Sequence, residues 1–176
     1  RTELAQARPG QLHIEAGIQC LDPAVQNFSG RCSDTEKLLD GLKYLCEQQS
    51  FVTHADLLAG LPGQRWENII ADTAKLMQLN TAEIQLEVLK ALPGTPLRSV
   101  ADAHGIKYNP SAPYDVMQSN TMSMEQIQYA RDLSRLLDIT YNHHFLHSTV
   151  WLMNRDCPDM VRKLLEFFHA AGGSST

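Results

Sequence analysis

The strongest constraint on the fold of this chain is a regular alternation of short apolar segments with longer amphipathic ones. Residues 11–18, 51–58 and 83–90 have the apolar alternation of half-buried strands. Between them, residues 34–48 and 65–79 carry apolar side chains at helical spacing. Strand, helix, strand, helix and strand in this order are typical of a parallel sheet, because each parallel pair needs a long crossover connection. The sequence therefore predicts an α/β fold.

Beyond residue 97 the chain loses its strand-like segments. We divide it into three βα units over residues 1–96, a helical extension over 97–171 and a flexible Gly-Ser tail over 172–176. A short helical turn is also expected to about residue 28, after Asp22-Pro23. Capping boxes are predicted at Ser33 with Glu36 and at Ser123 with Gln126. In the extension we expect helices over 97–104, 123–137, 139–153 and 157–170, with a proline-containing loop between the first two.

Composition and charge exclude several classes of protein. The 176 residues are 43% apolar and 20% charged, which suits a folded core and excludes a disordered or collagen-like chain. A formal net charge of −5 argues against a nucleic-acid binder, which needs basic side chains to neutralise phosphates. No apolar run approaches the length that spans a bilayer, and no signal peptide pattern is visible. We expect a soluble, cytoplasmic protein, and the start at Arg1 suggests a piece of a longer chain.

The cysteines and histidines give weak signals for a metal site. Cys20, Cys32, Cys46 and Cys157 do not have the spacing of a zinc or iron–sulfur motif, and free thiols are expected for an intracellular chain. His143-His144-x-x-His147 would place two imidazoles on one helix face, at a spacing that suits a metal. The acidic residue of the zincin motif is missing, however, so no metal site is predicted. A hydrolase that uses these three histidines remains one alternative.

Three motifs in order resemble a known family. They are HIEAGIQCLDPAV…SGR, THADLLAGLPGQ and EIQLEVLKALPGTPLRSVADAHGIKYNPSAPYDV, spread over residues 11–153. The chain resembles the C-terminal half of a radical SAM barrel, most closely the Fe–S oxidoreductases with an N-terminal cobalamin-binding domain that are related to the anaerobic magnesium-protoporphyrin monomethyl ester cyclase. The resemblance implies a partial TIM-type (β/α) barrel, of which these segments would be strands four, five and six, followed by a helical C-terminal extension.

The resemblance also implies roles for individual residues. Gln19 and Arg31 match family positions that contact the amino-acid and ribose parts of S-adenosylmethionine, and Asp56 matches a carboxylate that faces the ribose. Leu58 and the backbone near Lys90 match the adenine pocket. These side chains suit such contacts, because Arg31 could pair with a carboxylate through two hydrogen bonds. Each residue also has a structural alternative: Gln19 as a hydrogen bonder at a strand end, Arg31 in a surface ion pair, and Asp56 as a turn or cap residue.

The chain lacks the part of the family's sequence that binds the iron–sulfur cluster. The C-x3-C-x2-C run that binds the cluster is absent, as are the first three strands. The resemblance therefore implies that S-adenosylmethionine, a 4Fe-4S cluster and in some relatives cobalamin belong to a longer parent. We expect none of them bound to this chain, which we expect to be inactive alone. Gln85 and Glu87 would face the inside of the parent barrel, as candidates for substrate contact.

Two consequences concern partners. Without a preceding strand, residues 11–18 would form an open sheet edge, so we expect the chain to pair with the missing N-terminal half of its parent or to form a homodimer there. Neither a nucleic acid nor a membrane is expected as a partner. The second reading, from a different class, is a self-sufficient α/β binding or interaction module, for which the absence of the cysteine run is natural.

Overall fold

The computed structural model describes residues 6–8, 10–28, 34–48 and 51–173. Its strands are β1 (Leu12–Gln19), β2 (Phe51–Ala59), β3 (Glu83–Val88), β4 (Lys107–Tyr108) and β5 (Val116–Gln118). Its helices are α1 (Pro23–Phe28), α2 (Thr35–Glu47), α3 (Trp66–Gln78), α4 (Pro96–Ser99), α5 (Met124–Ile139), α6 (His147–Asp156) and α7 (Met160–Ala170), with a short 3₁₀ helix at Asp102–His104.

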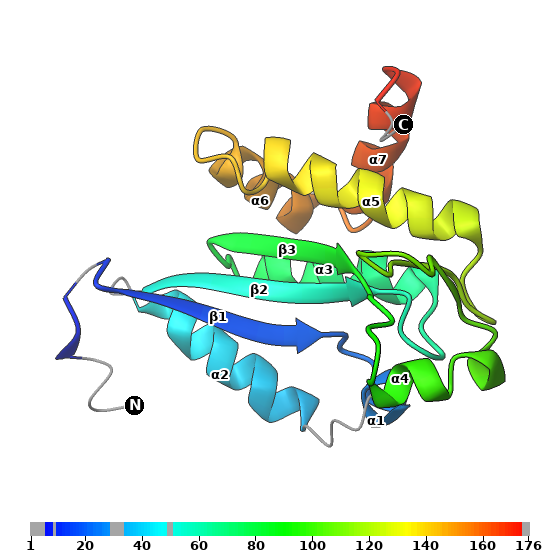
Figure 1. The fold of residues 1–176 in the computed structure, drawn as a ribbon. Helices are drawn as coiled ribbons and strands as arrows, with labels where there is room; N and C mark the ends of the chain where they lie inside the picture. Colours follow the sequence, from blue (N-terminus) through cyan, green and yellow to red (C-terminus); the bar gives the residue numbers. More distant parts are fainter. Residues whose placement is uncertain (1–5, 9, 29–33, 49–50, 174–176) are drawn as a thin grey trace.

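The centre of the fold is a three-stranded parallel sheet in the order β1-β2-β3, which confirms the predicted α/β class. Helices α2 and α3 connect its strands (Figure 1). The side chains of Ala55 and Leu57 on β2 and of Ile84 and Leu86 on β3 are buried, and they share one apolar cluster with α3. This open sheet is no closed barrel within the described residues, and the partial-barrel interpretation stays a proposal.

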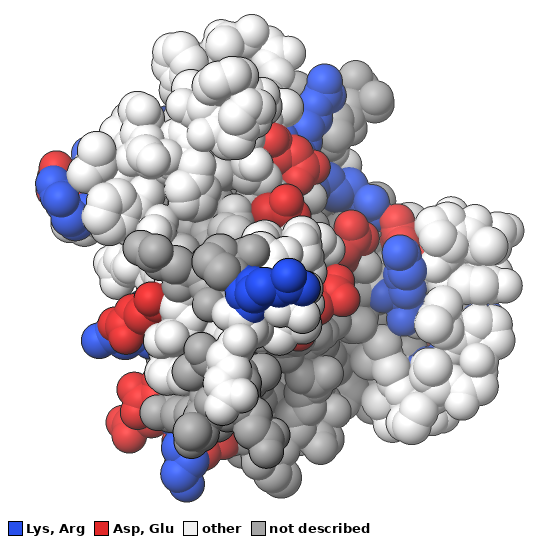
Figure 2. Space-filling model, turned by 90° about the vertical axis from the view of Figure 1, so that its left-hand side faces the viewer, with Lys and Arg blue, Asp and Glu red and all other residues white. Residues whose placement is uncertain are grey.

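The opposite face of the sheet is polar. His13 and Glu15 on β1 and Gln85 and Glu87 on β3 are exposed. Alternation along β1, β2 and β3 produces this division, because successive side chains of a strand point to opposite faces. On the face of the molecule at the amino ends of the strands, acidic and basic side chains are interspersed among uncharged ones (Figure 2).

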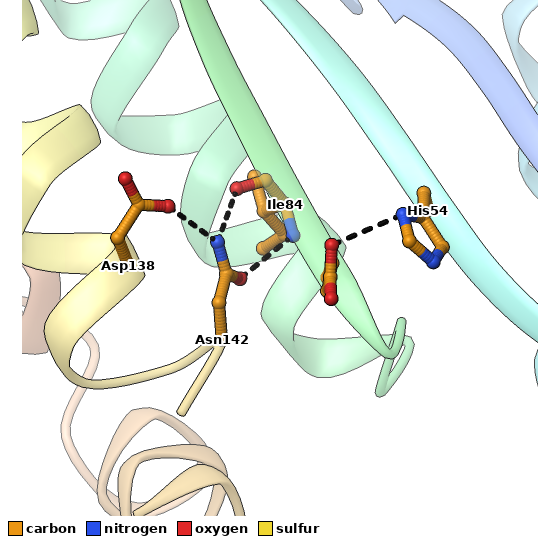
Figure 3. A network of polar contacts seen from close by, with 5 residues as sticks. His54, Ile84, Asp138 and Asn142 are labelled. Carbon is orange, nitrogen blue, oxygen red and sulfur yellow. Dashed lines mark hydrogen bonds and ion pairs between the residues drawn. The ribbon is translucent and has the colours of Figure 1, made fainter. Parts of the chain in front are cut away.

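The outer edge of β3 is closed by a side chain and by a loop segment. Asn142 follows α5, which packs along β3 (Figure 1). Its Oδ1 accepts a hydrogen bond from the Ile84 N–H at 2.9 Å, and its Nδ2 donates to the Ile84 carbonyl at 3.0 Å (Figure 3). Further along, the Val116 N–H donates to the carbonyl of Leu89, and the Ala91 N–H to that of Tyr114. These contacts replace a fourth strand. β1, in contrast, has only β2 as a neighbour among the described strands.

The structure corrects the sequence prediction in the helical extension. The helix expected over 139–153 is wrong in its first half, because α5 extends to Ile139, turns follow, and α6 begins at His147. Tertiary contacts hold this turn: the fully buried Tyr141 donates its hydroxyl to the Thr81 carbonyl at 2.7 Å, next to Asn142. The loop expected after residue 105 contains the short β4–β5 pair. The helix expected over 97–104 is α4 followed by the 3₁₀ helix.

Other boundaries agree to within a few residues. The capping box of Ser123 and Gln126 at α5 is confirmed. The capping residue of α2 is Asp34, whose side chain accepts a hydrogen bond from the Lys37 N–H, whereas Ser33 lies outside the described residues. The third strand ends at Val88, two residues earlier than predicted. No described helix is both long enough and apolar enough to cross a membrane.

Candidate functional site

A cavity of about 550 Å3 opens at the carboxyl ends of the three parallel strands. Gln19 and Leu58, at the ends of β1 and β2, line its base together with Leu89, which follows β3. Helices α1 and α4 lie at this end of the sheet (Figure 1). Ligands of open parallel sheets bind at this edge, because the loops and the helix N-termini converge there. The cavity is therefore the best candidate site among the described residues.

The loop after β2 is shaped by a buried glutamine that the sequence analysis missed. Gln64 is 1% exposed, and its Oε1 accepts hydrogen bonds from the N–H groups of Gly60 and Leu61 at 2.9 and 3.2 Å. Its Nε2 donates to the carbonyl of Leu58 at 2.7 Å. Gly60 has φ 96, and a Cβ there would lie 3.1 Å from a methyl group of Val116. The side chain of Gln64 thus fixes the strand end that presents Leu58.

The loop after β1 is fixed by hydrogen bonds to α1 and α3. Gln19 has φ 66, a left-handed conformation that is uncommon for a residue with a side chain, and the sheet register shifts beside it. The next carbonyl, of Cys20, accepts from the buried Gln26 amide, and the Leu21 N–H donates to Asp72 Oδ2 at 2.9 Å. Burial raises the pKa of Asp72, an effect that the Leu21 N–H opposes. These bonds hold the backbone around Gln19.

The outer wall of the cavity comes from segments far apart in the sequence. Phe28 at the end of α1 meets His104 at the end of the 3₁₀ helix, and Pro96, Leu97 and Val100 complete this wall. The segment that carries them is held by Arg98, whose guanidinium lies 5.0 Å from the ring centroid of Tyr108 and 5.3 Å from that of Tyr114. The site is thus mostly apolar, as ligand pockets usually are, and Gln19 is one of its few polar lining residues.

The five expected cofactor-binding residues do not all lie at the cavity. Gln19 and Leu58 line it, and Lys90 directly follows another lining residue, Leu89. The Lys90 ammonium lies 3.9 Å from Glu87, and its backbone forms a bridge with Asp115. Arg31 lies outside the described residues.

Asp56 is not among the residues that line the cavity. It lies two residues before Leu58 on the same face of β2, opposite Gly17 and Gln85 in the neighbouring strands. Burial raises the pKa of its carboxyl, as does the nearby Glu15, whereas His54 opposes the rise. Its Oδ1 is buried without a hydrogen-bond partner. This carboxylate therefore lies on the polar face of the sheet, below the cavity.

Gln85 and Glu87, the expected substrate-side residues, line a second cavity of about 230 Å3 between β3 and α5. Asp138 and Asn142 form its other side, where Asn142 donates to Asp138 at 3.1 Å (Figure 3). Glu83 also lines this cavity, and its carboxylate lies 3.0 Å from His54 Nδ1. The structure thus separates these residues from the cavity that holds Gln19 and Leu58.

The histidine cluster does not have the arrangement expected for a metal. His143 lies in the turn before α6, and His147, the first residue of that helix, donates its backbone N–H to the His143 carbonyl at 2.9 Å. Both ring nitrogens of His147 have protein partners, the carbonyl of Tyr141 at 2.8 Å and Asn80 Oδ1 at 3.0 Å. Within the described ranges, no three His, Cys, Asp or Glu residues converge to hold a metal ion.

Comparisons with known proteins match a family model and several solved structures. Residues 102–175, less than half of the chain, match a family described as a protein of unknown function (DUF4080). Among solved structures, the chain is similar to a radical S-adenosylmethionine methyltransferase, TsrM, from Kitasatospora setae, determined with cobalamin and a 4Fe-4S cluster bound. The identity is 19% and the TM-score 0.46; the match covers 67% of this chain and 24% of that chain, so this chain spans about a quarter of that structure's length. None of the curated proteins compared matches.

Proposed function

We propose that the cavity at the strand ends is part of a pocket for the adenosine portion of S-adenosylmethionine, and that the chain is a piece of a radical SAM enzyme. The observation that carries the proposal is the meeting of Gln19, Leu58 and Leu89, the neighbour of Lys90, in one mostly apolar cavity. The family resemblance of the sequence motifs implies contact with this cofactor for Gln19, Leu58 and the backbone near Lys90. Sequence resemblance and geometry thus support one ligand.

The residues present fit the adenosine portion of that cofactor. Leu58 and Leu89 offer apolar contact to a base, and the side-chain amide of Gln19 can hydrogen-bond a polar group of the ligand. The described thiols do not fit an iron–sulfur cluster, because a cluster needs several converging thiolates, and no three His, Cys, Asp or Glu residues converge within the described part of the chain. In this proposal the cluster, and cobalamin where it is used, are held by other parts of the parent.

The proposal is tested by nuclear magnetic resonance, with adenosine titrated into the isotope-labelled chain at millimolar concentration. We expect weak binding, with shifts confined to the amides around Gln19, Leu58 and Leu89. Leu58→Glu should abolish these shifts, because it places a carboxylate against the base, whereas the matched change Leu152→Glu on the exposed surface of α6 should leave them intact. Shifts elsewhere, or none in the unmodified chain, would refute the proposed pocket.

Inactivity of the chain alone is tested separately. After incubation with iron, sulfide and a reductant, we expect no 5′-deoxyadenosine from S-adenosylmethionine. Measurable turnover would show that the chain itself assembles the reactive centre.

The open edge of β1 favours a second candidate function, a self-sufficient interaction module. β3 is closed by Asn142 and by the segment around Val116, so strand addition is directed to β1. The gene upstream of Arg1 distinguishes the two candidates. A contiguous reading frame with a C-x3-C-x2-C run supports the radical SAM enzyme, and a start codon directly before Arg1 supports the module.

A further inference from the structure

An exposed aromatic ring stands at the outer wall of the candidate cavity. Phe28 is 60% exposed although it lines the cavity, whereas Leu61 at the base is 5% exposed. An apolar ring gains stability when a ligand covers it, since apolar surface is then removed from water. A ligand that fills the cavity would therefore make its largest new apolar contact with Phe28.

Two neighbours fix the orientation of this ring. The imidazole of His104 meets it edge-on, with ring centroids 5.4 Å apart and an interplanar angle of 81°. On another side the loop after β2 passes so close that a Cβ at Gly63 would lie 3.5 Å from Phe28 Cδ2. An edge-on contact is a favoured geometry for an aromatic pair. His104 and the backbone at Gly63 therefore both lie against the Phe28 ring and restrict its orientation.

We propose that Phe28, positioned by His104, stacks on the base of the bound ligand and makes this site selective for purine over pyrimidine nucleosides. The inference rests on the proposed function and deepens it. Leu58 and Leu89 provide the aliphatic side of the cavity. A purine has the larger aromatic surface, so its contact with Phe28 removes more apolar area from water than the contact of a pyrimidine does. Phe28 is the contact residue, and His104 is a positioning residue.

The test compares adenosine with uridine in the same titration. The unmodified chain should prefer adenosine, and Phe28→Ala should weaken adenosine binding about three- to tenfold, the usual strength of one aromatic pair, with little effect on uridine. Phe28→Leu keeps an apolar side chain and should also reduce the preference. His104→Ala should cause a smaller loss, and His104→Phe should restore the preference because it keeps an edge-on ring. Phe145→Ala, at a ring that is 78% exposed beside α6, is the matched control.

The outcomes separate the inference from the proposed function. If adenosine shifts the amides around Gln19 and Leu58 equally in the unmodified chain and in Phe28→Ala, the stacking role is wrong and the pocket stands. Equal binding of adenosine and uridine by the unmodified chain overturns the selectivity in the same way. If adenosine causes no shifts there, the pocket itself is refuted, and the inference with it.

Discussion

The closure of β3 by Asn142 leads to a prediction with a magnitude that follows from the structure. One side-chain amide satisfies both backbone groups of Ile84, as a neighbouring strand would, and also donates to Asp138 (Figure 3). Asn142→Leu keeps a side chain of similar size but removes all three hydrogen bonds. The N–H and the carbonyl of Ile84 are then left without a partner at the sheet edge.

The expected loss is about 2–3 kcal/mol in the free energy of unfolding. A backbone group that loses its partner in a fully buried place costs about 1–3 kcal/mol, and partial access of water at this edge reduces that cost. The loss is a substantial part of the roughly 5–15 kcal/mol by which a domain is stable. Apolar contacts of the substituted leucine offset a small part of this loss, and the range of about 2–3 kcal/mol takes this gain into account.

Urea denaturation followed by circular dichroism measures this loss. Asn109→Leu is the matched control, because Asn109 is exposed and accepts one local hydrogen bond, from the Ser111 N–H. We expect the control to lose less than about 1 kcal/mol. If both variants lose the same small amount, the side-chain amide of Asn142 does not close the sheet and the reasoning is wrong.

Three further predictions concern the strands and their loops. Gly60→Ala should lower the free energy of unfolding by about 1–3 kcal/mol in a urea titration, because φ is 96 and the added Cβ would crowd Val116; an unchanged midpoint would contradict this conformation. The raised pKa of Asp56 means that the folded state holds its proton more tightly than the unfolded state, so wild-type stability falls as pH rises above 3.8. Asp56→Asn should therefore be the more stable variant at pH 7 and lose this advantage as the pH approaches 4, whereas a pH-independent difference would show another cause. Across the open edge of β1 we expect a concentration-dependent dimer in sedimentation, which Ile14→Lys should weaken; a strictly monomeric wild-type chain would refute this.

Local patterns were sufficient to predict the sheet and its connecting helices. The alternation over 51–58 and the helical spacing over 65–79 reflect contacts that each segment makes with one shared core, so the sequence of each segment contains the signal. The order of the segments then implied parallel pairing. It also implied that the ends of β1 and β2 meet at one edge, which is why Gln19 and Leu58 could be expected together.

The errors occur where contacts between distant segments override local preference. The turn at 140–146 exists because Tyr141 bonds Thr81 and Asn142 bonds Ile84, and no pattern within 139–153 reveals either partner. The two- and three-residue strands β4 and β5 are too short for any periodicity. The outer wall of the cavity also depends on contacts between distant segments, because Phe28 and His104 meet only in the folded chain. A signal for Gln64 did exist, a polar residue directly after the turn Leu61-Pro62-Gly63.

The two edge strands of the parallel sheet differ in whether their outward-facing backbone groups are hydrogen-bonded. This difference bears on both candidate functions. A long open strand tends to pair with another chain, so folded proteins usually cover or disrupt such edges. On β3 the chain provides this protection with the Asn142 amide and the segment around Val116. On β1, seven of the eight residues pair with β2, which is the only neighbour of β1 among the strands described. A partner strand, whether from a longer parent or from a second copy, would therefore add beside β1 and next to Gln19, which is where a pocket for a larger ligand would be completed.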